Sequence, residues 1–164
     1  MENLKLNHLP VAKAQMLIRR PVAEVFEAFA DPAVTSQFWF TKGSGKLEVG
    51  KKVKWDWEMY GISRQVDVKA IEPNRRILVD WSSPDGKPPT PTTVEWCFDP
   101  RSGDTTFVTI TNTGFSGNGD QVVDQASNSM VGFSLVLAGL KALLEHNVAL
   151  NLVADHAPEA LMKH

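Results

Sequence analysis

The stretch from Asp120 to Val148 constrains the fold more than any other part of the chain. Its apolar residues recur at steps of three and four, the spacing of one face of an α-helix. These residues are Val122, Ala126, Met130, Phe133, Leu137, Leu140, Leu144 and Val148. At about 1.5 Å per residue, such a helix is roughly 40 Å long and spans a small domain. Asp120 follows Gly117-Asn118-Gly119 and is the predicted N-cap.

A second apolar stripe follows the same predicted helix. It consists of Val131, Leu135, Ala138 and Ala142. Between Met130 and Glu145, only Ser134, Lys141 and Glu145 are polar or charged. A helix that is apolar on so much of its circumference must be buried. The rest of the chain, or another chain, therefore has to cover it.

Composition narrows the class of protein. A length of 164 residues fits one domain, and a net charge of −2 gives no reason to expect nucleic acid or an anionic membrane as a partner. No run of about 18 apolar residues predicts a transmembrane span. Met1–Lys5 lacks the features of a signal peptide, and the single Cys97 excludes an intrachain disulfide. These features predict a cytoplasmic protein.

The remaining pattern predicts a sheet. Val11–Arg19 alternates as a strand, and short helices are expected from Pro21 to Asp31 and from Ala33 to Phe40. Between Leu47 and Thr113 the apolar period is two, with short turns and one longer exposed loop over Pro84–Pro89. The expected strands there are Val53–Met59, Ile62–Ile71, Ile77–Trp81, Val94–Phe98 and Thr105–Thr113. Connections this short favour an antiparallel meander.

Together these elements predict an α+β fold. A curved antiparallel sheet wraps around one long C-terminal helix, and two short helices follow the first strand. Residues 1–164 form a single domain with its core at about 12–148. Residues 1–10 and 155–164 are expected to be flexible ends.

Several segments resemble a known superfamily. They are Pro21–Phe29 with Asp31-Pro32, Phe38-Trp39-Phe40, and Gly132–Glu145. Over about residues 12–148 the chain resembles START-like proteins, the helix-grip (Bet v-like) superfamily known as SRPBCC. Within it, the chain looks most like the group named after the activator of heat-shock protein 90 ATPase. That group more often has Gly-Trp where this chain has Gly132-Phe133. The resemblance implies an apolar cavity between sheet and helix.

Eleven residues are predicted to face that cavity and to bind a ligand. They are Trp55, Trp57, Met59, Arg64, Val66, Val79, Trp81, Trp96, Asn112, Phe133 and Leu137. The aromatic members either line a pocket or form a plain core. A buried guanidinium is costly unless paired, so Arg64 reaches a partner, the cavity rim or a ligand. Asn112 can offer its amide to a polar group.

No catalytic, metal or cofactor site is predicted. The four histidines, His8, His146, His156 and His164, lack metal-ligand spacing, and no Gly-x-Ser-x-Gly motif occurs. Cys97 alternates with Trp96 and Phe98 and therefore faces away from the cavity. Asp56 and Glu58 share the outer face of a strand with lysines.

Three functions remain open. The first is a binding protein for a hydrophobic or aromatic small molecule. The second is an enzyme of the polyketide-cyclase or hydratase type that uses the same cavity. The third is a co-chaperone, which the group name implies. The eukaryotic activator has a separate chaperone-binding domain, and residues 1–11 are too short to replace it. We therefore expect no stimulation of the chaperone's ATPase.

The second stripe leads to one further prediction. Val131, Leu135, Ala138 and Ala142 cannot be covered by a sheet that grips the first stripe. Either Phe26, Phe29 and the Leu150–Val153 segment fold over them, or a second copy of the chain does. The second option predicts a homodimer through the C-terminal helix.

Overall fold

The sheet of the computed structural model, which describes residues 4–83 and 91–161, contains seven antiparallel strands. They are β1 (Ala12–Ile18), β2 (Lys42–Gly43), β3 (Lys52–Trp57), β4 (Ile62–Glu72), β5 (Arg76–Ser82), β6 (Thr92–Arg101) and β7 (Thr105–Thr113). Their order, β1-β7-β6-β5-β4-β3-β2, contains the predicted meander from β3 to β7, with β1 paired to β7. The two-residue strand β2 was not predicted. The predicted loop Pro84–Pro89 lies outside the described residues.

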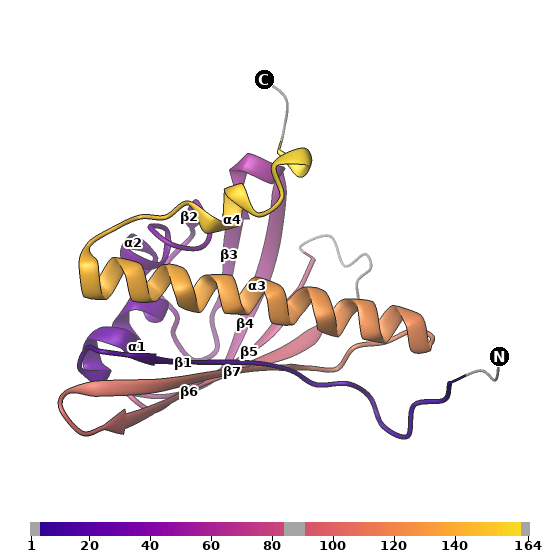
Figure 1. Cartoon of the computed structure of the whole chain (residues 1–164), viewed down its shortest axis with the longest axis horizontal. Coiled ribbons are helices and arrows are strands. Elements are labelled where there is room, and N and C mark those ends of the chain that lie inside the picture. The colour runs from indigo at the N-terminus through magenta and orange to yellow at the C-terminus, as the bar shows by residue number, and fades with distance from the viewer. Residues whose placement is uncertain (1–3, 84–90, 162–164) are drawn as a thin grey trace.

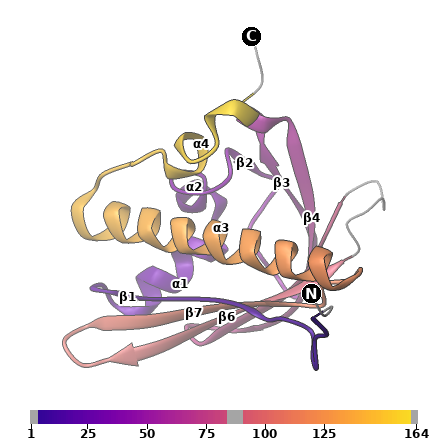
Figure 2. The ribbon, with the colours of Figure 1, turned by 45° about the vertical axis from the view of Figure 1, so that its right-hand side comes forward.

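One long helix lies across this sheet. It is α3 (Gly119–His146), and the sheet curves around it so that β3 and β4 rise beside it while β1, β6 and β7 lie beneath (Figures 1 and 2). The short helical elements are α1 (Val22–Ala30), α2 (Pro32–Thr35), η1 (Glu58–Tyr60), α4 (Leu152–Asp155) and η2 (Pro158–Ala160). The predicted α+β helix-grip architecture is therefore confirmed.

The segment after α1 differs from the prediction. Pro21 is the N-cap of α1 and not its first helical residue, and α2 ends at Thr35 rather than at Phe40. The Thr35 hydroxyl donates to the Ala28 carbonyl at 2.5 Å, which fixes α2 against α1. Phe38-Trp39-Phe40 therefore lies outside the helix, in the turn that leads into β2.

The cap of α3 also differs. Asn118, not Asp120, is the N-cap: its side chain accepts a hydrogen bond from the Gln121 backbone at 2.9 Å. The Gln121 side chain accepts from the Asn118 backbone N–H at 2.8 Å. This reciprocal capping box satisfies two backbone donors at once, which a cap by Asp120 would not do.

The first apolar stripe of α3 packs on the sheet, as expected. The buried helix residues are Val122, Ala126, Phe133, Val136, Leu137, Gly139 and Leu140. Met130 and Val148, which the periodicity assigned to this face, are exposed, and Val148 lies beyond the helix end. Among the described residues, α3 is the one helix long and apolar enough to cross a membrane by length and composition alone. Its buried face accounts for part of that apolar character.

The residues after α3 fold back along it. Leu152 and Val153 lie beside Gly139 and Met59, on the flank of α3 that faces α2 and β2 (Figure 1). The Tyr60 hydroxyl donates to the Val153 carbonyl. Burial raises the pKa of Tyr60, and the nearby Asp155 carboxylate raises it further. Of the end that was expected to be flexible, residues 158–160 form the turn η2.

A polar cluster fastens the C-terminal end of α3 to β1. Glu145 Oε2 accepts from the Arg19 backbone N–H at 3.0 Å and from Lys141 Nζ at 2.6 Å. Lys141 Nζ also donates to the Leu17 carbonyl at 2.8 Å. Burial alone would raise the pKa of Glu145, but the Arg19 N–H and the Lys141 ammonium outweigh it and lower the pKa.

Replacing Glu145 by Gln tests this cluster. A carboxyl whose pKa is lowered in the folded state adds stability above its unfolded pKa of about 4.3, and this stability is lost as the pH falls through the folded pKa. We expect Glu145→Gln to lower the free energy of unfolding by about 1–2 kcal/mol at pH 7, because a charge-assisted hydrogen bond becomes neutral. Urea unfolding from pH 7 to pH 3 should show the difference shrinking below about pH 4.

The control is Glu24→Gln, which removes an exposed pair with Arg20 on α1. Such pairs contribute little, so this variant should unfold like the wild type. A Glu145→Gln deficit of equal size at pH 7 and pH 3 would contradict the proposed role of the ionised carboxylate.

Candidate functional site: a pocket beside the first half of the long helix

The space between sheet and helix is filled by Trp39. Its ring centroid lies 4.9 Å from that of Trp55 and 5.6 Å from that of Trp81, on which it stacks at 19°. It also packs against further aromatic rings, those of Phe29, Phe40, Trp57, Trp96 and Phe133. The Trp39 backbone N–H donates to the Thr35 carbonyl at 3.0 Å, so α2 positions the turn that carries it.

Most of the predicted site residues form core around this ring. Trp55, Trp57, Val66, Val79, Trp96 and Leu137 are buried and do not line the main pocket. Strand alternation correctly pointed the five sheet residues toward the helix, and helical spacing placed Leu137 on the buried face of α3. Met59 lies in η1, not on β3, and lines a small cavity of about 130 Å³ beneath the C-terminal segment.

The main pocket lies between the first half of α3 and the sheet. Its volume is about 430 Å³, within the usual range for small-molecule sites. It is lined by Trp39, Arg64, Trp81, Thr92, Val94, Asn112, Phe115, Gln125, Asn128, Ser129, Gly132 and Phe133. Arg64, Trp81, Asn112 and Phe133 are the four predicted residues that the structure brings together here.

Strand register places these side chains at one end of the sheet. Trp81 pairs with Thr92 across β5 and β6, and Val94 pairs with Asn112 across β6 and β7. Because Val94 and Asn112 point to the helix side, they form a polar and apolar floor under α3. Trp39 and Phe133 separate this floor from the core.

Asn112 connects the sheet to the helix. Its Nδ2 donates to the Thr93 carbonyl at 2.9 Å, and its Oδ1 accepts from Ser129 Oγ at 2.8 Å. The side chain is almost fully buried, and these two bonds satisfy both ends of its amide. Asn112 therefore positions Ser129, and with it the wall of the pocket that α3 provides.

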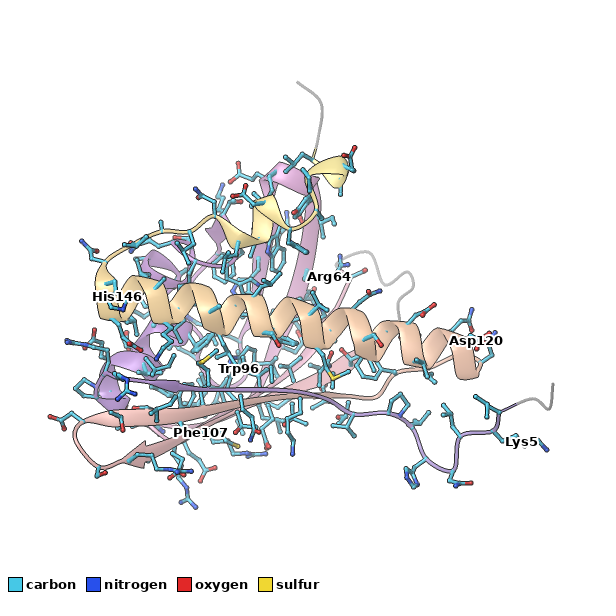
Figure 3. The ribbon with its side chains drawn as sticks, in the orientation of Figure 1. Lys5, Arg64, Trp96, Phe107, Asp120 and His146 are labelled. Carbon is cyan, nitrogen blue, oxygen red and sulfur yellow. The ribbon has the colours of Figure 1, made fainter. Side chains whose placement is uncertain are left out.

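Arg64 is the charged member of the described pocket lining. It is half-buried on β4, and its Nη1 donates to the Ser63 carbonyl at 2.9 Å. Figure 3 labels Arg64 beside α3, whose residues line the same pocket. The described lining has no carboxylate, imidazole or thiol, and its guanidinium stays charged. It therefore offers no general acid or base that titrates near neutral pH. Among the described residues, no His, Cys, Asp or Glu cluster could hold a metal ion.

Cys97 and Asp56 lie on the outer face of the sheet, as expected, whereas Glu58 lies in η1 and not on a strand. Cys97 Sγ lies 3.5 Å from Glu95 Oε1, outside the core. Burial raises the pKa of the Cys97 thiol, and Glu95 raises it further, which keeps the thiol protonated. The hydrogen bond from Ser63 lowers the pKa of Asp56, a surface carboxylate beside Lys54.

Eight lining residues were missed by sequence reasoning. They are Trp39, Thr92, Val94, Phe115, Gln125, Asn128, Ser129 and Gly132. A signal existed for the last four: they recur at three, four and seven residues from Gln125 and so share one helix face. Small and polar side chains beside a buried apolar stripe leave space for a pocket and provide hydrogen-bonding groups to line it. No periodic signal marks Trp39, because it lies in a turn.

Two comparisons of sequence bear on the site. The family model described as "Activator of Hsp90 ATPase homolog 1-like protein" matches residues 19–145, from the end of β1 to the last turn of α3. A comparison with curated proteins gave no significant match.

Solved structures with similar folds were also found. Protein SSP2350 from Staphylococcus saprophyticus is 28% identical, with a TM-score of 0.72 over 86% of this chain and 96% of that one. The Aha1 dimer from Colwellia psychrerythraea is 17% identical, with a TM-score of 0.71 over 84% of this chain and 98% of that one. DynU16, described as a putative protein in the dynemicin biosynthetic locus, is 20% identical, with a TM-score of 0.69 over 85% and 48%. The last two likenesses show the fold alone.

Proposed function

Because the chain belongs to the family described as activator of Hsp90 ATPase homolog 1-like, we propose that it binds a hydrophobic or aromatic small molecule between sheet and helix. The observation that carries this proposal is the pocket of about 430 Å³ beside the first half of α3. A filled interior alone would need no ligand, but this pocket remains open although Trp39 occupies the space behind it.

The lining suggests how a ligand is oriented. Trp81 and Phe133 offer aromatic surfaces on the sheet and helix sides. Asn128 on α3 and Arg64 on β4 offer hydrogen-bond donors, and Gln125, whose Nε2 donates to the Ser116 and Gln121 carbonyls, offers its amide oxygen as an acceptor. A mainly apolar ligand with one polar or anionic group would therefore place its rings on the aromatic surfaces and direct that group to Arg64 or to α3.

The enzyme alternative has less support. Cyclisation and hydration both need a group that takes up or delivers a proton, and the described lining contains none that titrates near neutral pH. Its support is the likeness in fold to DynU16, at 20% identity. Binding without acid–base chemistry is therefore the function we favour.

The co-chaperone alternative rests on the family description and on the likeness to the Colwellia protein. No described surface feature of this chain points to a chaperone partner.

The cytoplasmic location stays a prediction, which the lone Cys97 supports because a disulfide-stabilised domain is typical of oxidising compartments.

Filling the pocket at Gly132 tests the proposal. Gly132 lines the pocket, and a Cβ atom built on it meets no atom within 4 Å. Leucine there should project into the pocket without a clash and should favour the helix by about 0.5–1 kcal/mol. We expect lipophilic compounds that shift the wild-type melting temperature and tryptophan fluorescence to bind Gly132→Leu at least about tenfold more weakly.

The matched control is Gly119→Leu, at the start of the same helix, where a Cβ atom also meets nothing within 4 Å. It lies outside the pocket lining and should keep wild-type affinity. A diverse lipophilic library without any effect on the wild type would refute the binding function. Equal affinity for wild type and Gly132→Leu would place the ligand elsewhere.

We also propose a homodimer through α3. The second apolar stripe is only partly covered: the side of α3 facing away from the sheet leaves Val131 55% exposed, and Val123 and Met130 are exposed as well. The Leu152–Val153 segment packs on a different flank, next to Gly139 and Met59. The similar Colwellia protein is described as a dimer, which agrees with self-association.

Val131→Glu should separate the dimer into folded monomers. A charge at the centre of a helix–helix contact would lose its hydration without gaining a partner. Leu135, half-buried within the protomer, is a less suitable site for this change. Sedimentation equilibrium at tens of micromolar should give a dimer for the wild type and a monomer for Val131→Glu, with unchanged circular dichroism.

Val49→Glu is the control, because Val49 is 62% exposed between β2 and β3, away from α3. It should remain dimeric. A wild-type monomer at these concentrations would end the dimer proposal without affecting the pocket.

A further inference from the structure

The indole N–H of Trp96 lacks a hydrogen-bond partner. Trp96 lies on β6 and is fully buried between the sheet and α3 (Figure 3). Its Nε1 is the one buried side-chain nitrogen or oxygen among the described residues that forms no hydrogen bond. Leaving a buried donor unpaired is unfavourable, and native proteins rarely do so without a ligand, a water molecule or a functional reason.

The surroundings of Trp96 are aromatic and lie next to the pocket. The ring centroids of Phe29, Trp39 and Phe133 lie 5.9, 6.1 and 6.3 Å from that of Trp96. Trp39 and Phe133 also line the pocket, and so does Val94, which precedes Trp96 by one inward position on β6. Trp96 therefore lies directly behind the inner wall of the pocket.

Trp39 is the part of that wall that belongs neither to the sheet nor to α3. It belongs to the turn between α2 and β2, whereas Phe133 belongs to the middle of α3. Its ring stacks on Trp81, which is itself partly exposed at the pocket. A planar ligand could take over this stacking as Trp39 turns aside, and the pocket would then extend to Trp96.

We propose that Trp96 donates its indole N–H to an acceptor oxygen at the buried end of the ligand, which is reached when Trp39 moves aside. This inference rests on the proposed binding function and narrows the ligand class. The ligand is flat and mostly apolar, with a carbonyl, ether or hydroxyl oxygen at its inner end. A compound without that oxygen leaves the N–H unpaired, so the site discriminates against it.

Two small probes of similar shape test this discrimination. 1-Tetralone carries a carbonyl oxygen, and tetralin lacks it. The quantity to measure is the ratio of the dissociation constant of tetralin to that of 1-tetralone, which cancels general effects on the pocket. Trp96→Phe keeps an aromatic ring but removes the N–H, and the ratio should fall about three- to tenfold from wild type.

Trp57→Phe is the matched control. Trp57 is a buried tryptophan on β3 that also packs against Trp39, but its nitrogen is not an unpaired buried donor. Its ratio should equal that of the wild type. In ¹H–¹⁵N spectra, 1-tetralone should shift the Trp96 indole N–H signal downfield, and tetralin should not. If Trp96→Phe does not fold, contacts to Phe29 and Phe133 assign this signal in the wild type.

Each outcome separates the two proposals. If both probes bind but the ratio is the same in wild type and Trp96→Phe, or the Trp96 signal does not respond, the inference is wrong and the binding function stands. A resident water or the face of Phe133 would then satisfy the N–H. If neither probe binds the wild type while other lipophilic compounds do, the ligand class proposed here is wrong. If no compound binds, both proposals fail.

Discussion

The packing of Trp39 into the space between sheet and helix is the interaction on which the rest of the structure depends. A curved sheet that grips a helix leaves an interior that must be filled by side chains or by a ligand. Here Trp39 provides the filling over the deep part, where it meets Trp55, Trp57 and Trp96. The remaining space is displaced toward the first half of α3 and forms the pocket.

The position of α3 sets the width of that pocket. At the C-terminal end, Glu145 and Lys141 fasten the helix to β1. Near the pocket, the hydrogen bond between Ser129 and Asn112 fixes the distance between helix and sheet. With α3 held at these two places, an adaptation to a ligand has to come from side chains or from the turn that carries Trp39, since α3 cannot move away without breaking these hydrogen bonds.

Periodicity predicted the fold well, because the regular geometry of a strand or helix fixes which of its side chains share the inward face. The alternation along β7, which placed Asn112 inward, is an example, and so is the buried face of α3. The cap of α3 was assigned to Asp120 because residue type alone does not distinguish it from Asn118; the reciprocal bonds with Gln121 do.

The candidate site was only partly predictable for the same reason. Sequence patterns placed Arg64, Trp81, Asn112 and Phe133 inward, but they could not tell which part of the interior would be filled. That depended on Trp39, a turn residue whose side-chain direction follows from the tertiary structure. The expected deep cavity among Trp55, Trp57 and Trp96 is therefore a packed core, and the open pocket lies beside it.

The stability of Trp39→Ala, measured with and without added indole, tests this account most directly. If Trp39 fills the interior, the variant should lose about 3–5 kcal/mol of stability, and millimolar indole should raise the melting temperature of the variant by more than it raises that of the wild type. Phe98→Ala, which removes a buried ring farther along β6, should be destabilised but not restored by indole. A Trp39→Ala variant as stable as the wild type, or one that indole does not stabilise, would contradict the account.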